Sequence, residues 1–289
     1  MDNGSMSRRE MLAWCSACGL ATMGLTRLPE RRSSEYHRLV LEKNPVGYWR
    51  LDEERGPTAH DSSSHHHDGT YVGSPAFRER GAIAGDADTA VALNGRRSYV
   101  EVPDHAQFSV STSGHGLSVE VWMRPDAVLF TGQTEEHYIH WLGKGEPGQF
   151  EWGFRFYSRR SPRPNRLSAY IWNPDGGLGA GAYVQEAVQE FAWMHLVACY
   201  APGDKSDPMA GVSLYRNGVL RGSPPTQKGA RYSSYDIVPA HGSAPLRLGT
   251  RDLGSFLKGG LDEVAIYPRV LSAEEVREHY QAGTGRNAG

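Results

Sequence analysis

The chain is poor in cysteine, in long apolar runs and in excess charge of either sign. Its 289 residues include three cysteines, and no apolar run approaches the roughly 20 residues of a membrane-spanning helix. Three cysteines are too few for a disulfide scaffold, and Cys199 lies in an apolar run typical of a buried strand. The formal charge of −2, from 31 basic and 33 acidic side chains, offers no positive surplus to a phosphate backbone. We therefore expect no disulfide-rich miniprotein, no membrane span in the mature protein and no nucleic-acid partner.

Turn-forming residues, in contrast, are abundant. The chain has 34 glycines and 17 prolines, which favour many short elements over long helices. Its 39% hydrophobic residues are enough for a packed core. The length suits one large β domain, since such domains often reach about 200–250 residues. We expect one folded domain over residues 36–284.

The first 32 residues have the pattern of an export signal. Residues 7–12, Ser-Arg-Arg-Glu-Met-Leu, resemble a twin-arginine motif, and a mildly apolar stretch follows as far as residue 26. Such a segment directs export and is not part of the folded domain. The sequence predicts residues 1–32 to be signal and linker, and the protein to be periplasmic, cell-surface or extracellular. The alternative is a frayed basic N-terminus on a cytosolic protein.

Segments with a period of two predict β-strands. In residues 117–124, Leu, Val, Val and Met alternate with Ser, Glu, Trp and Arg, the pattern of a strand with one buried face. Asn217-Gly218 between two apolar runs predicts a tight hairpin, because both turn residues adopt positive φ. Further runs of strand-forming residues occupy 99–102, 151–157, 166–172, 193–200, 246–249 and 261–267. Strands separated by turns, without helices between them, favour a sandwich or jelly roll over a parallel sheet.

Helical signals are confined to the two ends of the predicted domain. Residues 35–43 predict a short helix that ends before Pro45. Ser272 and Glu275 have the spacing of a capping box, and Gly283 marks a helix end about three turns later. The expected fold is therefore all-β, with short helices only near the ends.

An ordered set of short motifs runs through the chain. The motifs are YWRLDE at 48–53, DSS at 61–63, DGTY at 68–71, GDADTAV at 85–91, NG at 94–95, YVEVP at 99–103, the strand at 117–125, WMHLV at 193–197, LYRNG at 214–218, GLDEVAIY at 260–267 and LSAEEV at 271–276. In this order they resemble the bacterial laminin-G-like (LamG) domains of the concanavalin A-like lectin/glucanase superfamily. The resemblance covers residues 36–283 and implies a two-sheet antiparallel jelly-roll sandwich. It also implies structural roles for Trp49, Trp122 and Trp193, which lie in framework strands.

The resembled superfamily contains both lectins and glucanases, so binding and catalysis are both considered. Retaining glycosidases need two carboxyl groups about 5–5.5 Å apart, which such members carry as Glu-x-Asp-x-x-Glu or a close variant. The chain has no such triplet. We therefore expect no catalytic residues and a non-catalytic binding module. The alternatives are a glycan-active hydrolase or lyase of this superfamily, and a structural surface-assembly protein.

Aromatic residues in the middle of the chain are the candidates for carbohydrate contact, because flat rings stack on the apolar faces of sugars. We predict Trp152, Tyr157, Tyr170 and Trp172 to be ligand-binding residues. Trp172 is the first choice for an exposed platform, because the turn at 173–177 follows it directly. A core position is the alternative for each ring. The expected partner is a carbohydrate or glycoconjugate, or a protein that uses the same face.

The resemblance also implies a structural Ca²⁺ ion. In the resembled family a calcium often joins the Asp-Ser-Ser loop to the Asp-Glu-Val strand, which here correspond to Asp61 and Asp262. We expect these carboxylates and His67, with carbonyl oxygens of the 65–67 loop, to form the site. Calcium takes about six to eight oxygen ligands, and two adjacent carboxylates repel unless a cation neutralises them. The alternatives are a turn-forming role for Asp61 and a polar loop at 65–67.

Overall fold

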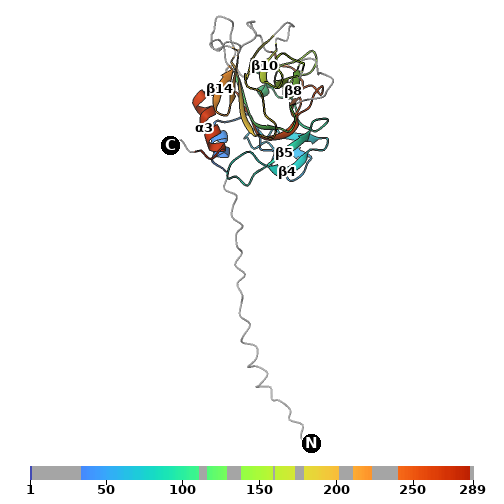
Figure 1. The fold of residues 1–289 in the computed structure, drawn as a ribbon. Helices are drawn as coiled ribbons and strands as arrows, with labels where there is room; N and C mark the ends of the chain where they lie inside the picture. Colours follow the sequence, from blue (N-terminus) through green and yellow to red (C-terminus); the bar gives the residue numbers. More distant parts are fainter. Residues whose placement is uncertain are drawn as a thin grey trace. The chain divides into compact units, whose positions relative to one another are not determined.

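The structure, a computed structural model, describes residues 1, 34–110, 116–128, 138–158, 160–172, 179–201, 211–222 and 240–286. The chain divides into two units, Met1–Arg32 and Ser33–Gly289, and every described helix and strand belongs to the second (Figure 1). Apart from Met1, the predicted export segment lies outside the described residues.

The described strands form two antiparallel sheets of eight strands each (Figure 1). The first sheet contains β1 (Gly47–Trp49), β4 (Ala76–Arg80), β5 (Thr89–Asn94), β7 (Leu117–Pro125), β12 (Met194–Ala201), β13 (Gly211–Arg216), β14 (Val219–Gly222) and β16 (Lys258–Tyr267). Its order is β14-β13-β12-β7-β16-β5-β4, and β1 also pairs with β16. β12, β13 and β14 are consecutive in the chain, as are β4 and β5, whereas the central pairs β12–β7, β7–β16 and β16–β5 join segments that are distant in sequence.

The second sheet contains β2 (Thr58–Ala59), β3 (Gly69–Val72), β6 (Tyr99–Val102), β8 (Tyr138–Lys144), β9 (Trp152–Tyr157), β10 (Leu167–Ile171), β11 (Ala180–Tyr183) and β15 (Leu246–Leu248). Its order is β11-β10-β9-β8-β15-β6-β3-β2. A short 3-10 helix, η1 (Ala106–Phe108), follows β6. The prediction of an all-β sandwich of two antiparallel sheets is confirmed.

The main core lies between the two sheets, where alternate residues of each strand meet. Trp49 of the first sheet and Trp141, Trp152 and Phe154 of the second are fully buried there. Burial of a large apolar side chain contributes about 1.5–3 kcal/mol, so this layer supplies much of the stability of the sandwich. Residues between the inward positions face away from this layer.

The hairpin between β13 and β14 has the predicted turn. Asn217 and Gly218 adopt φ values of 54° and 75°, the left-handed conformation that a two-residue hairpin loop requires. The turn is also fastened to β12, since the Asn217 N–H donates to the His195 carbonyl oxygen at 2.8 Å. The hairpin prediction from Asn-Gly is confirmed.

The two described α-helices, α1 (Glu35–Glu42) and α3 (Ala273–Gly283), cover the outer face of the first sheet (Figure 1). Ser272 and Glu275 form the predicted capping box at the start of α3. Tyr36 of α1 and Val276 of α3 pack with Trp122 of β7 in a second apolar cluster. The expectation that β7 has one solvent-facing side is therefore wrong, because these helices bury its second side.

No helix in the described segments is both long enough and apolar enough to span a lipid bilayer.

Candidate functional site

The outer face of the second sheet carries rings and arginines because strand alternation places them there. In β9, Phe154 and Phe156 point into the core, so Arg155 between them points outward. In β10, Ile171 points inward and Tyr170 outward by the same alternation. We call the outward group the ring–arginine patch, and it consists of Tyr138, His140, Phe150, Arg155, Tyr170, Trp172 and Arg251.

Members of the ring–arginine patch pack around Trp172 in tilted and edge-on arrangements. The Trp172 ring centroid lies 4.7 Å from that of Tyr170, 5.6 Å from His140 and 5.7 Å from Phe150. Arg251 Cζ lies 4.3 Å from the Trp172 centroid and 4.0 Å from that of Phe150. Guanidinium groups over ring faces gain cation–π attraction, so the patch is held in one arrangement.

Arg251 is a buried cation with unused hydrogen-bonding capacity. Its side chain is only 2% exposed and is paired with Asp252. Its Nε and Nη1 atoms have no hydrogen-bond partner among the described residues. Burial lowers the pKa of Arg251 to about 10, because the charged guanidinium is removed from water. Burial, together with the charges of Arg251 and Arg155, also holds the pKa of His140 well below its usual value.

The four predicted ligand residues have different environments. Trp152 is fully buried between the sheets, and its Nε1 donates to the Phe108 carbonyl oxygen at 2.8 Å. The prediction of Trp152 as a ligand residue is therefore wrong. Tyr157 and Tyr170 lie on the outer side of their strands but are buried. Trp172 remains half-buried, and the turn at 173–177 lies outside the described residues.

Asp61 organises its own loop. Its Oδ1 accepts hydrogen bonds from the N–H groups of Tyr48 and Ser63, at 2.7 and 2.8 Å. Its Oδ2 accepts from the Ser63 hydroxyl at 2.8 Å and from the His67 N–H at 2.7 Å. The His67 carbonyl oxygen, an expected calcium ligand, accepts from Trp49 Nε1 at 3.0 Å. These are the bonds of a turn-forming aspartate.

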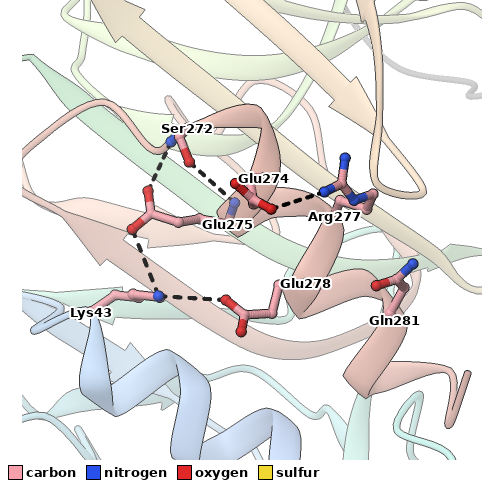
Figure 2. Close-up of a pocket in the computed structure, with 7 residues that line it drawn as sticks. All are labelled: Lys43, Ser272, Glu274, Glu275, Arg277, Glu278 and Gln281. Atoms are coloured by element: carbon pink, nitrogen blue, oxygen red, sulfur yellow. Dashed lines mark hydrogen bonds and ion pairs between the residues drawn. The ribbon is translucent and has the colours of Figure 1, made fainter. Parts of the chain in front are cut away.

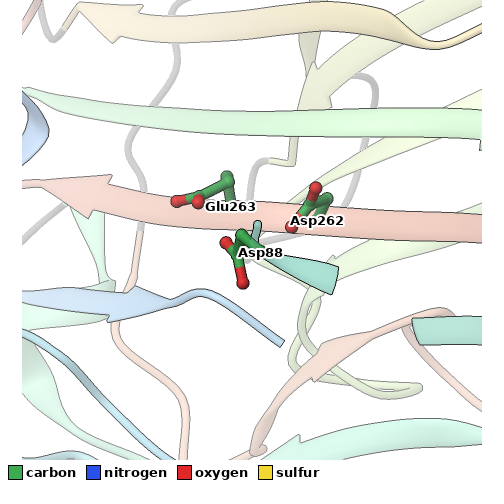
Figure 3. Close-up of side chains that lie close together, drawn as sticks. All are labelled: Asp88, Asp262 and Glu263. Carbon is green, nitrogen blue, oxygen red and sulfur yellow. The ribbon is translucent and has the colours of Figure 1, made fainter. Parts of the chain in front are cut away.

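The predicted set of Asp61, His67 and Asp262 is not brought together. Asp262 instead belongs to an acidic cluster with Asp88 and Glu263, whose ligand atoms all lie within 4.8 Å of one another (Figure 3). This is a correction to the predicted metal ligands. The sequence places Asp262 and Glu263 side by side, but only the pairing of β16 with β5 brings the segment before β5, and with it Asp88, to them.

The acidic cluster is buried and is contacted by one arginine. Arg50 lies within hydrogen-bonding distance of both Asp88 and Glu263. Asp262 Oδ2 accepts from the Ala82 N–H at 2.7 Å, whereas Asp262 Oδ1 has no partner among the described residues. Burial and the neighbouring carboxyl groups raise the pKa of Asp88 to about 9 and that of Glu263 to about 7. A further cation would therefore relieve repulsion here.

A second buried network lies beneath the helices, around Glu120 of β7. Tyr36 and Tyr267 donate to the Glu120 carboxylate at 2.9 and 2.7 Å. His195 Nε2 and His279 Nδ1 lie 2.7 and 2.9 Å from its oxygens. These four partners come from α1, β12, β16 and α3, so one carboxylate joins both helices to the sheet. Sequence alternation did not reveal this network, because it assigns position 120 to the solvent side.

A hollow of about 630 Å³ lies beside α3 (Figure 2). Lys43 Nζ lies 3.8 Å from Glu275 and 3.5 Å from Glu278, and Arg277 pairs with Glu274 at 3.2 Å. All seven lining residues are polar or charged and have no aromatic ring. Because its charges pair with one another and it offers no apolar platform, we assign no ligand to this hollow.

Two eight-stranded antiparallel sheets, with helices over one outer face, define a lectin-like β-sandwich. The laminin-G-type family model described as the concanavalin A-like lectin/glucanases superfamily matches residues 94–277. The chain belongs to this family, and the resemblance drawn from the sequence motifs is confirmed. No curated protein matches the chain.

Solved structures with the same fold include proteins that were studied with carbohydrates. One is domain 4 of AbnA, a GH43 extracellular arabinanase from Geobacillus stearothermophilus, in complex with arabinotriose. It is 20% identical to this chain with a TM-score of 0.53, and the match covers 82% of this chain and 98% of that domain. Another is the receptor binding domain of botulinum neurotoxin C/D mosaic serotype, with 11% identity, a TM-score of 0.56, and coverage of 82% and 51%. A third is Trypanosoma rangeli sialidase in complex with sialic acid, with 13% identity, a TM-score of 0.51, and coverage of 82% and 32%.

The chain thus spans nearly all of the arabinanase domain, about half of the neurotoxin chain and about a third of the sialidase. At these identities the likeness shows the fold alone.

Proposed function

We propose that the chain is an exported, non-catalytic module that binds carbohydrate through the ring–arginine patch, with Trp172 as the stacking platform. The observation that carries this proposal is the state of Trp172, which is half-buried while its neighbouring rings are packed against it. A ring fixed by its neighbours loses little conformational freedom on binding, which favours affinity. Convergent polar groups beside an apolar platform are typical of small-molecule sites.

The relatives support the class of ligand. The arabinanase domain was solved with arabinotriose, the sialidase with sialic acid, and a binding domain of botulinum neurotoxin DC with SialylT. These ligands belong to those proteins, and their diversity favours a glycan-related role without naming one sugar. A protein partner that contacts the same face is the alternative.

The non-catalytic part of the proposal rests on the carboxylates. The described residues hold a cluster of three carboxyl groups, Asp88, Asp262 and Glu263, which are 8%, 0% and 0% exposed. A general acid and a nucleophile must both reach the glycosidic bond. Buried carboxyls that contact Arg50 are poorly placed for that task, so we propose binding without hydrolysis.

Truncation of the platform is expected to weaken sugar binding strongly. In a glycan array, Trp172→Ala should lose affinity by about 30-fold or more, the effect of removing a central aromatic contact of about 2 kcal/mol. Phe256→Ala, which removes a half-buried ring outside the patch, is the matched control and should bind as the wild type does. Equal binding by Trp172→Ala and wild type would contradict the platform, and reducing ends released by wild type would contradict the non-catalytic proposal.

Export is proposed from the sequence of residues 7–12. A reporter fused after Arg32 should leave the cytoplasm, because paired arginines followed by an apolar stretch form a signal that an export receptor recognises. Changing Arg8 and Arg9 to lysine should stop export while preserving the charge. Export that is indifferent to this double change would argue against a twin-arginine signal.

We also propose a structural Ca²⁺ ion, held by the acidic cluster of Asp88, Asp262 and Glu263. Carboxylate oxygens are the ligands that Ca²⁺ prefers, and Asp262 Oδ1 is a buried acceptor with no donor among the described residues. Three adjacent carboxyl groups, contacted among the described residues by the one guanidinium of Arg50, also favour a divalent cation. When bound, the ion would neutralise the cluster and link β16 to the segment that precedes β5.

A further inference from the structure

A second hollow, of about 500 Å³, is lined by residues 80–88 together with Arg124, Phe191 and Trp193. All of its lining residues are described, and none belongs to the ring–arginine patch. Its size lies within the range of about 300–1,000 Å³ typical of small-molecule sites. Unlike the hollow beside α3, its lining combines two aromatic rings with charged groups of both signs.

Trp193 provides a flat surface in this hollow because of a glycine. Gly260 of β16 pairs with Arg124 of β7, so the two residues are neighbours on adjacent strands. A Cβ atom at Gly260 would lie 2.7 Å from Trp193 Cη2, which places the indole directly against this backbone. Arg124 Cζ lies 5.2 Å from the indole centroid. The indole of Trp193 therefore packs directly against the sheet. Trp193, for which the sequence implied a structural role, also lines this hollow.

Phe191 is an exposed ring held in a costly conformation. Its side chain is 70% exposed, the largest exposure of any aromatic residue in the described segments. Its φ is 62°, a value that a bulky residue rarely adopts, and its N–H donates to the Pro125 carbonyl oxygen at 2.7 Å. Such strain costs on the order of 1–3 kcal/mol and is found preferentially at binding sites. The hydrogen bond to Pro125 holds the backbone of Phe191 in this conformation, and the exposed ring beside the hollow is accessible to a ligand.

The polar groups around these rings offer both donors and acceptors. Arg124 donates to Asp126 at 2.9 Å, and Arg80 is exposed at the edge of the hollow. Asp86 also lines the hollow, and its Oδ2 lies 3.4 Å from Arg50. A strongly charged ligand would meet a like charge in this lining, which has both arginine and aspartate side chains. A hydroxyl group, which both donates and accepts, suits both kinds of side chain.

We propose that this hollow is a second carbohydrate site, which binds a neutral sugar by stacking on Trp193 and Phe191, with hydroxyl contacts to Arg124 and Asp86. The site goes beyond the proposed function because it needs no residue of the ring–arginine patch. Two independent sites on one domain raise the avidity for a polymeric glycan, since the second contact becomes intramolecular.

The test is an NMR titration of the ¹⁵N-labelled protein with arabinotriose, xylotriose, cellotriose and sialyllactose. A neutral trisaccharide should shift the amide signals of residues 81–88 and the Trp193 indole signal. Phe191→Ala should weaken this event by about tenfold or more, and the folded domain should be retained because the ring is 70% exposed. Gly260→Ala, which displaces the indole, should weaken the same event. Val219→Ala, at an exposed apolar position outside the hollow, is the matched control.

The outcomes separate this site from the patch. Trp172→Ala should leave the shifts at 81–88 unchanged, and their disappearance in that variant would overturn an independent second site. Wild-type affinity at 81–88 in both Phe191→Ala and Gly260→Ala would also overturn it, whether or not the patch binds. No shift at 81–88 with any of the four probes overturns the second site, even where signals near Trp172 respond. Shifts at 81–88 without a response near Trp172 would support the hollow and contradict the proposed platform.

Discussion

Replacing Glu120 by glutamine is expected to lower the free energy of unfolding by about 3–5 kcal/mol, the cost of breaking a buried charge network on one side. The carboxylate is fully buried and is contacted by Tyr36, His195, Tyr267 and His279. A neutral amide cannot accept from all four partners, and it leaves the positive charge of His279 uncompensated. Because these partners come from both helices and two strands, the helices should loosen from the sheet first.

The same network predicts a bell-shaped pH dependence of stability. Burial opposes ionisation of Glu120, but His279 and His195 outweigh it and hold the pKa of Glu120 well below its usual value. Its contribution is present above about pH 4.5 and is lost as the pH falls through the lowered pKa. Burial opposes the charged form of His279, but Glu120 outweighs it and raises the pKa of His279. That contribution is complete below about pH 6.5 and is lost as the pH rises through the raised pKa.

Urea unfolding of wild type and Glu120→Gln between pH 4 and 9 measures both effects. The difference between the two proteins should be largest near pH 5–6 and should shrink on either side. Glu274→Gln, an exposed glutamate of α3 paired with Arg277, is the matched control and should change the free energy by less than about 1 kcal/mol. A Glu120→Gln protein as stable as wild type at pH 6 would contradict the role of the network.

Calcium is expected to stabilise the domain by about 2.7 kcal/mol at a hundred-fold excess over its dissociation constant, a rise in melting temperature of about 5–10 °C. The physical reason is the acidic cluster, where Asp88, Asp262 and Glu263 lie within 4.8 Å of one another and Asp262 Oδ1 has no donor among the described residues. An ion that binds there only in the folded state shifts the folding equilibrium by mass action. Thermal unfolding at pH 7.5 with calcium and with chelator measures the shift.

Two variants locate the ion. Asp262→Asn should remove most of the calcium-dependent rise, because it removes one of three charged ligands. Asp61→Asn should lower the melting temperature in both conditions, since Asp61 anchors a loop through four hydrogen bonds, but it should keep the calcium-dependent rise. If Asp61→Asn lost the calcium-dependent rise in melting temperature and Asp262→Asn kept it, the calcium site would lie at the Asp-Ser-Ser loop instead. Identical wild-type curves with calcium and with chelator would eliminate the proposed ion.

The features that the sequence predicted correctly depend on near neighbours along the chain. The hairpin at Asn217-Gly218 needs two residues that tolerate positive φ, and the start of α3 needs Ser272 and Glu275 three positions apart. Strand alternation likewise acts between residues two positions apart, so it identifies most strands. The ordered motifs add the sandwich and the family, because the matched region from 94 to 277 contains most of them.

The features that the sequence did not predict depend on which distant segments meet. Alternation in β7 places Glu120 on the side opposite Val119 and Val121, but it cannot show that two helices from the chain ends cover that side. Trp152 and Trp172 look alike in sequence, and only the packing of the sheets buries the first completely and leaves the second half-buried. Asp262 lies far along the chain from Asp88, and strand pairing makes them neighbours.

The sequence by itself therefore determined many of the strands, the helices at the two ends and the class of fold, because local backbone preferences and side-chain periodicity act over a few residues. The tertiary structure decided which carboxylates form the acidic cluster, which aromatic rings remain accessible and which charged groups are buried together. These outcomes depend on long-range pairing and on the loss of solvent at each position, since a side chain's pKa and its access to a ligand follow from its neighbours in space.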